Sequence, residues 1–227
     1  MRSVRSEKRR RAAPVILGAV CAIVLGLAAP RPGGAEETWW GGMLADVAWL
    51  RLSLAWERRD EPAVRALMRW TLAAAPKVDF FRLNAARIIA YDLPAWRTLA
   101  EPEAPAALVR RWRSAAAGEA AALLLAGETG DPALWLEAAN IALYAGGDRE
   151  LAAMRYRRAA ELPGAPWHAG RIHAQLLREL GRDREALEWL RAWSLRLPAQ
   201  DPAAQRELVL ARIAELEEAL RARGEPL

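Results

Sequence analysis

Apolar residues recur every three or four positions along most of the chain, which places them on one side of an α-helix. Two clear series are Ile172, Leu176, Leu180 and Val209, Ile213, Leu216, Leu220. Alternation of apolar and polar residues is scarce, and no Asn-Gly or Asp-Gly turn separates β-branched runs. Alanine, leucine, arginine and glutamate, all good helix formers, dominate the composition. The pattern therefore predicts an all-α fold.

Helix starts and ends are also marked in the sequence. Asp131-Pro132 and Asp201-Pro202 each place a capping aspartate before a proline at the first helical position. Gly147, Gly181 and Pro198 interrupt the apolar series. We predict helices over residues 38–58, 61–75, 79–91, 104–126, 132–145, 148–162, 166–180, 183–197 and 202–222. Helices of this length with short turns are expected to pack as antiparallel neighbours.

A repeat with a period of 34 residues is visible in the second half. The pairs Gly147 and Gly181, Ala152 and Ala186, and Tyr156 and Leu190 each lie 34 apart. This is the period of helix-turn-helix solenoids. The glycine would close the inter-helix turn, the small residue would let two helices approach, and the large residue would fill the groove between them.

These residues resemble the tetratricopeptide repeat (TPR) family. Gly181, Ala186, Leu190 and Pro198 match the family's four positions, whereas Pro163 comes one residue early in the preceding unit. The resemblance is good over 132–198, fair over 44–76, where Arg59 replaces the glycine, and weak over 77–131. Pro94, Pro102 and Pro105 are expected to break any regular unit in that middle stretch.

The first 35 residues have the order of an export signal. A basic head precedes the apolar run from Val15 to Ala29, and small residues lead to Ala35. This order is typical of a signal peptide cleaved after Ala35. The alternative is an inner-membrane anchor over residues 15–29, although a span needs about 17–25 residues. Both interpretations place residues 36–227 in the periplasm or another extracytoplasmic space, because the basic head favours staying inside.

The expected organisation follows from these segments. Residues 1–35 form the signal peptide or membrane anchor, 36–131 a degenerate helical repeat region, 132–200 the TPR-like helix pairs, and 201–227 a C-terminal capping helix. The apolar series of the last helix would cover the final pair, as terminal repeats require.

The positive charge of the chain does not indicate a nucleic-acid ligand. Residues 1–35 contain seven basic residues and one acidic residue, so 26 of the chain's 33 basic and 27 of its 28 acidic residues lie beyond them. The body is electrically balanced and has no basic cluster to neutralise phosphates. We therefore expect no nucleic acid as a partner, and a membrane contact only through the N-terminal segment if it is retained.

Residue patterns that carry chemistry are missing. The sequence has no phosphate-binding glycine loop, zinc-protease motif or nucleophile elbow. Its two histidines, His168 and His173, are five apart and face different sides of a helix, and its one cysteine, Cys21, lies in the leader. We expect no catalytic residue, metal or cofactor. The eleven tryptophans are interpreted as helix-packing residues, with stacking platforms for ligands as the alternative.

The TPR resemblance implies binding of a protein or peptide along the concave surface formed by the first helix of each unit. The residues that it places there are Glu137, Tyr144, His168, Arg171, Gln175 and Arg178. Arginines seven apart share one helix face and grip carboxylates with forked hydrogen bonds; an ordinary solvated face is the alternative. We expect a non-enzymatic scaffold or assembly factor of the cell envelope. The other two hypotheses are a helical enzyme or accessory subunit, and a carrier of apolar ligands or glycans.

Overall fold

The computed structural model describes residues 39–127 and 129–225. All regular structure in this part of the chain is helical, and no strand occurs in it. The prediction of an all-helical fold is therefore confirmed. Within the same residues, no helix combines the length and the apolar character needed to cross a membrane. The proposed signal peptide or anchor over residues 1–35 lies outside the described residues.

The chain divides into two compact units, with the boundary after Phe81. The first unit contains α2 (Trp39–Glu57) and α3 (Glu61–Ala74), which pack along each other. Its small core is formed by Ala45, Ala75 and Phe81, with the ring of Trp49 packed against them. The centroids of the Trp49 indole and the Phe81 phenyl ring are 5.3 Å apart, so an aromatic contact is part of the core of this unit.

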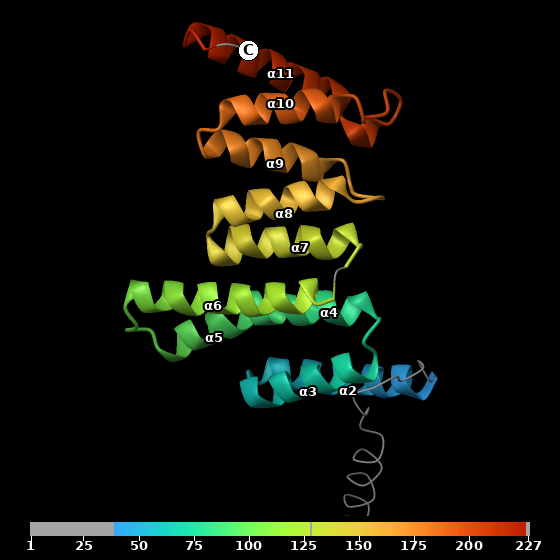
Figure 1. Cartoon of the computed structure of the whole chain (residues 1–227). Helices are drawn as coiled ribbons and strands as arrows, with labels where there is room; N and C mark the ends of the chain where they lie inside the picture. Colours follow the sequence, from blue (N-terminus) through green and yellow to red (C-terminus); the bar gives the residue numbers. More distant parts are fainter. Residues whose placement is uncertain (1–38, 128, 226–227) are drawn as a thin grey trace, which may run out of the picture. The chain divides into compact units, whose positions relative to one another are not determined.

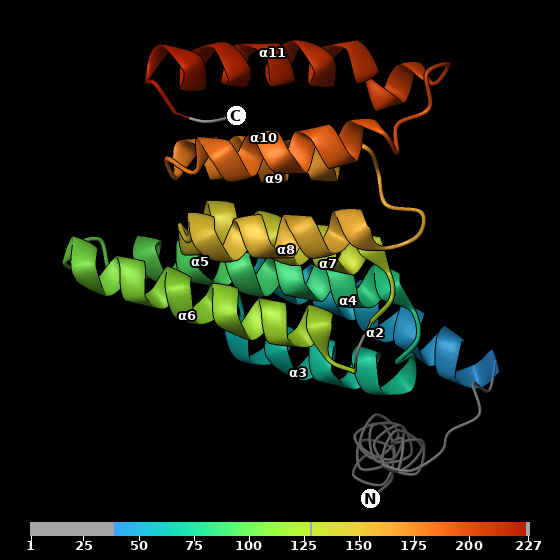
Figure 2. The ribbon, with the colours of Figure 1, turned by 45° about the horizontal axis from the view of Figure 1, so that its top comes forward.

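The second unit is a series of helices in which consecutive members pack on one another. They are α4 (Asp79–Arg87, which crosses the boundary), α5 (Leu93–Ala100), α6 (Ala106–Leu125), α7 (Pro132–Ile141), α8 (Arg149–Glu161), α9 (His168–Glu179), α10 (Asp183–Ser194) and α11 (Arg206–Ala222). From α6 to α11 each helix contacts the next (Figure 1). Figure 2 shows α8 and α10 on one side of this stack, with α7 and α9 behind them.

Helix α4 continues into α5, contrary to the prediction of a helix ending at residue 91. A π-turn over Ile88–Asp92 joins the two, and Pro94 is buried in the first turn of α5 instead of breaking it. In the π-turn the amide of Leu93 bonds to the carbonyl of Ile88, five residues back. This wider turn accommodates a proline ring that would otherwise clash with the preceding turn.

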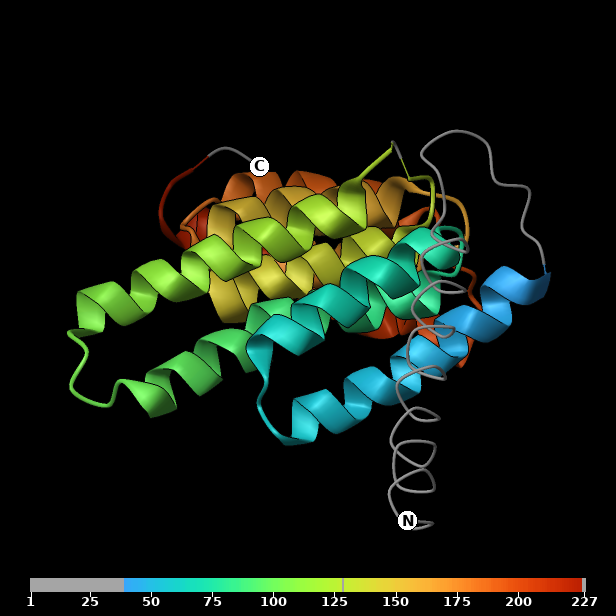
Figure 3. The same ribbon diagram turned by 90° about the horizontal axis from the view of Figure 1, so that it is seen from below.

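The prediction for the other two prolines of this region holds. Pro102 and Pro105 lie between α5 and α6, where the chain reverses direction (Figure 3). Helix α6 then runs back beside α5 and the π-turn. A second π-turn, over Ala142–Gly146, extends α7 up to Gly147.

Residues at equivalent positions of the 34-residue period have equivalent backbone conformations. Gly147 and Gly181, between α7 and α8 and between α9 and α10, have φ of 71° and 75°. Arg59, which replaces the glycine between α2 and α3, also has a left-handed φ, of 54°. A glycine adopts this conformation without strain, whereas an arginine rarely does. The turn geometry therefore recurs even where the sequence departs from the pattern.

The small and large residues of the period are all in the core. Ala152 and Ala186 are fully buried, and Tyr156 and Leu190 are nearly so. The small side chains let adjacent helices approach, as the sequence predicts. Around Ala186 the buried residues of α9, α10 and α11 merge into one apolar cluster.

Tryptophans fill much of this cluster. Trp193 of α10 is buried, stacks on Trp189 with ring centroids 5.7 Å apart, and meets Trp167 edge to face at 6.2 Å. The ring of Trp193 lies directly against the backbone of Gly170 on α9. The interpretation of these tryptophans as packing residues is confirmed. Trp56 of α2, to which the same interpretation applied, is 40% exposed.

Candidate partner-binding site

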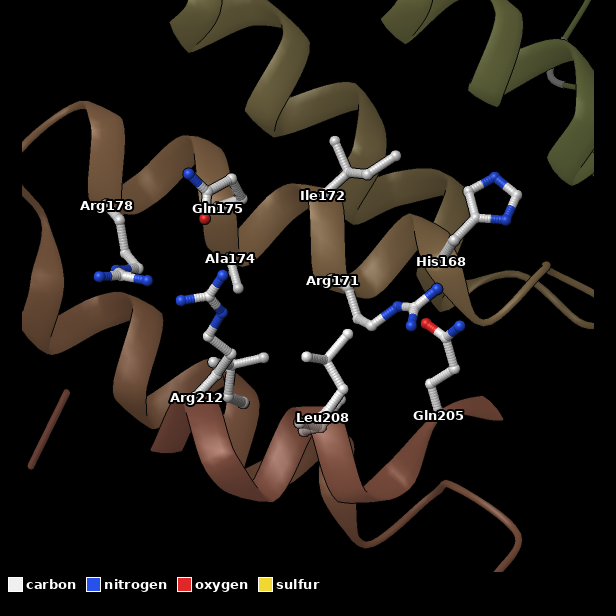
Figure 4. Close-up of a pocket in the computed structure, with 11 residues that line it drawn as sticks. His168, Arg171, Ile172, Ala174, Gln175, Arg178, Gln205, Leu208 and Arg212 are labelled. Atoms are coloured by element: carbon white, nitrogen blue, oxygen red, sulfur yellow. The ribbon is translucent and has the colours of Figure 1, made fainter. Parts of the chain in front are cut away.

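A pocket of about 530 Å³ lies between α9 and α11 (Figure 4). Both helices pack on α10, which separates them and leaves a gap above its own surface. Leu190 of α10, Ala174 of α9 and Val209 of α11 line the gap and are themselves buried. The pocket is therefore a groove with an apolar floor, and its rim is formed by the polar sides of two helices.

Four residues predicted from the sequence form one wall of this pocket. His168, Arg171, Gln175 and Arg178 follow each other on α9 at intervals of three, four and three residues, and all line the pocket. Residues at this spacing share one face of a helix. The opposite side of α9 is buried against α8 and α10, so this face is the one left open. The structure thus brings together the part of the predicted groove that comes from the best-matching repeat.

The opposite wall comes from α11 and was not predicted. Gln205, Leu208 and Arg212 line the pocket from this side. Figure 4 shows the side chains of Arg171 and Gln205 directed toward each other across the gap. Leu208 and Arg212 lie four residues apart, beside the buried series that begins at Val209. That spacing was the available signal, but the sequence does not reveal that this face of α11 is opposite α9.

The pocket is electropositive. Its eleven lining residues, all within the described part of the chain, include three arginines and no carboxylate. Arg212 pairs with Glu215 at 2.6 Å, and Arg178 lies 3.9 Å from the same carboxylate, so one acidic group serves two guanidinium groups. The pocket keeps uncompensated positive charge beside an apolar floor.

Arg171 carries the most unusual polar atom of the site. Its Nη1 is buried and has no hydrogen-bond partner among the described residues. Buried polar atoms are nearly always paired, and a guanidinium binds carboxylates with two parallel N–H···O bonds. An anionic group in the pocket would lie beside this guanidinium and compensate its charge.

His168 adds polarity to the pocket without adding charge. Burial lowers the pKa of its imidazole, and the positive charge of Arg171 lowers the pKa further. The ring is therefore neutral at neutral pH and can both donate and accept a hydrogen bond.

The other two predicted residues do not line the pocket. Glu137 of α7 is nearly buried and forms two hydrogen bonds with Arg87 of α4, Nε to Oε1 at 2.9 Å and Nη2 to Oε2 at 2.8 Å. This pairing raises the pKa of the Arg87 guanidinium. Glu137 therefore has a structural role in joining α7 to α4. Tyr144 lies in the π-turn after α7 and is 72% exposed.

One carboxylate joins the two sides of the pocket at their N-terminal ends. Asp201 accepts a hydrogen bond from the indole of Trp167, just before α9, at 2.9 Å. Its other oxygen caps the short 3-10 helix Pro202–Ala204 by accepting from the amide of Ala203 at 2.9 Å. That helix leads through Gln205 into α11, so the beginnings of α9 and α11 are held together.

These groups suit recognition of a ligand by charge, hydrogen bonding and apolar contact. Arg171, Arg178 and Arg212 offer forked donors to carboxylates, and Gln175 and Gln205 carry amides of the kind that pair with a peptide backbone. Among the described residues, no group of histidine, aspartate and glutamate side chains is placed to hold a metal ion.

Comparisons with known proteins add no assignment. No family model, curated protein or solved structure that was compared with the chain matches it. The groove between α9 and α11 is therefore the basis on which a function can be inferred.

Proposed function

We propose that this chain is a non-enzymatic protein-binding scaffold or assembly factor of the cell envelope. Its partner would place an extended segment in the groove between α9 and α11. That segment carries a carboxylate next to an apolar side chain: the carboxylate meets Arg171, and the side chain contacts Leu190, Leu208 and Val209. The observation that carries this proposal is a groove with an apolar floor that is lined by three arginines and by no carboxylate.

The arrangement of charges supports an acidic segment as the ligand. Three arginines line the groove, and Glu215 is the carboxylate that pairs with two of them. A cationic ligand would be repelled, and an uncharged one would leave Arg171 unsatisfied. An open groove with polar walls also suits an extended peptide, whose backbone needs hydrogen-bond partners along its length.

The same proposal includes a TPR-like solenoid. Left-handed turn residues at positions 59, 147 and 181 and the buried Ala152 and Ala186 support equivalent helix pairs in both units. In such a solenoid α7, α9 and α11 would line the concave side, which is where the groove lies. The basic and apolar leader supports export, and hence a partner in the periplasm or at the inner membrane.

Selection from a peptide library displayed on phage tests this function with the purified full-length chain. We expect enriched peptides to contain an aspartate, a glutamate or a free C-terminal carboxylate within two residues of an apolar side chain. Arg171→Leu should weaken binding of a selected peptide about 10- to 100-fold, because a hydrogen bond between charged groups is lost.

Arg184→Leu is the matched control. Arg184 is an exposed arginine on α10 that pairs with Glu188 at 3.6 Å and does not line the groove, so its removal should leave binding unchanged. Selected peptides without acidic groups, or equal affinity of the Arg171→Leu variant and the wild type, would contradict the proposal.

A further inference from the structure

Helix α2 has a second apolar face that the first unit does not bury. Its buried face consists of Ala45, Ala48, Leu52 and Ala55, packed toward α3. On another side, a row of large apolar residues is 50–67% exposed: Trp40, Met43, Val47, Leu50 and Leu54. At 100° per residue, the centres of the two faces lie about 140° apart around the helix. The exposed row is therefore available to a partner while α2 remains packed on α3.

The spacing of the exposed row is that of a coiled-coil seam. Its members follow each other by three, four, three and four residues, which is the alternation of the a and d positions of a heptad. Val47 and Leu54 then occupy a positions, and Met43 and Leu50 occupy d positions. At the centre of the row, Val47 at a followed by Leu50 at d is the combination that favours two parallel strands.

Charged residues beside the row are complementary to those of a second copy. Asp46 takes the g position before Val47, and Arg51 takes the e position after Leu50. In a parallel pair a g residue faces the e residue five positions later in the other chain, so Asp46 of each copy meets Arg51 of the other. Both side chains are exposed. An antiparallel pair would bring g opposite g and e opposite e, which offers no attraction to either charge.

We infer that α2 is a dimerisation helix, which pairs in parallel with α2 of a second copy of this chain through Trp40, Met43, Val47, Leu50 and Leu54. The interface is symmetric and self-complementary, as a two-fold axis requires. A parallel pair also places the N-terminal ends of both α2 helices side by side, which suits two chains whose leaders enter one membrane. This inference does not depend on the proposed function of the α9–α11 groove.

A lipid surface is a less suitable occupant of this face. Helices that lie on membranes carry several lysines or arginines on their polar side. Between residues 39 and 57, α2 has only Arg51 as a basic residue, against Asp46 and Glu57 as acids. Its side opposite the row is packed on α3 and cannot serve as a solvated polar face.

Cysteine cross-linking in intact cells that express the full chain tests the inference. Cys21, the only cysteine, is first replaced by serine. Leu50→Cys in that background should form a disulfide-linked dimer under mild oxidation, because equivalent d residues face each other across the seam within the about 4.4–6.8 Å that a disulfide allows between Cα atoms. Ser53→Cys is the matched control. Ser53 is also exposed and lies three residues later, but at a g position it points away from Ser53 of the other copy.

Charge exchange provides a second readout that loss of folding cannot imitate. Asp46→Arg places like charges at both symmetry-related contacts and should lower the association constant about tenfold. Adding Arg51→Asp restores opposite charges and should restore the cross-linking yield of Leu50→Cys. Equal cross-linking at positions 50 and 53, or no recovery in the exchanged variant, would overturn the inference. A Leu50→Cys thiol that fails to cross-link, and is shielded from a water-soluble maleimide only when lipid is present, would assign the row to the membrane instead.

Discussion

Replacing Gly170 with alanine should destabilise the chain, although the same change in a helix is usually favourable. Gly170 lies in the first turn of α9, where alanine is intrinsically better than glycine by up to about 1 kcal/mol. A Cβ at this position would lie 2.3 Å from Cε2 of Trp193 and 2.7 Å from Cδ2 and Cζ2. Carbon atoms prefer separations of about 3.5–4.0 Å, so the ring or the helix must move by about 1.2 Å.

The surroundings of Trp193 leave little room for that movement. The ring stacks on Trp189, meets Trp167 edge to face, and has the guanidinium of Arg196 over it, 4.7 Å from the centroid. Overpacking of such a site costs about 1–3 kcal/mol, and more where the neighbours are fixed. With the helix propensity subtracted from the upper part of that range, we expect a net loss of about 1–2 kcal/mol and a melting temperature about 3–8 °C lower.

Gly118→Ala is the matched control for this experiment. Gly118 is an exposed residue of α6 in the same unit, and a Cβ there has nothing within 4 Å. That variant should gain about 0.5–1 kcal/mol. Thermal and urea unfolding of the full-length chain, followed by circular dichroism, measures both. In the double variant Gly170→Ala, Trp193→Leu, the loss should be smaller than the sum of the single losses. A Gly170→Ala variant as stable as the wild type would refute the contact between α9 and α10.

Two further predictions concern buried polar groups. Burial lowers the pKa of His173 to about 4, while its Nδ1–H donates to the carbonyl of Ala153 at 2.8 Å. The unfolded state therefore takes up the proton first as pH falls below about 6.5, and stability should drop by about 2–3 kcal/mol between pH 7 and 4.5. Urea unfolding should show a smaller loss of stability over this pH range for His173→Phe than for the wild type. An equal loss would contradict the attribution of this pH dependence to His173. For the pair of Arg87 and Glu137, Arg87→Leu should cost about 3 kcal/mol and Glu137→Leu only about 1 kcal/mol, because only the glutamate is buried. Urea unfolding measures both losses. A larger loss for Glu137→Leu than for Arg87→Leu would contradict the view that the glutamate is the desolvated partner.

Much of the second unit could be predicted because its information is local. The series Ile172, Leu176, Leu180 on α9 and the caps at Asp131 and Asp201 depend on residues within one or two helical turns. The same locality explains why the sequence predicts that four residues of α9 line one wall of the groove. Their spacing alone fixes a common face once the opposite face is apolar.

The remaining features depend on contacts between distant segments. Glu137 and Arg87 are 50 residues apart, and no local pattern indicates that they pair. Gly170 is small because of Trp193, which belongs to the next helix. The π-turn after α7 changes the helical register, so Tyr144 does not take the place that a regular helix would give it. The position of Leu208 and Arg212 opposite α9 likewise requires the path of the chain through residues 195–205.

The carboxylate of Asp201 has a consequence for how this molecule can change its specificity. It joins the beginnings of the two helices at one end of the groove, yet it does not line the groove. Substitutions at Asp201 or Trp167 would therefore alter the width of the groove while keeping every arginine that lines it. If the groove binds a protein segment as proposed, its width and its charge can therefore change independently of each other.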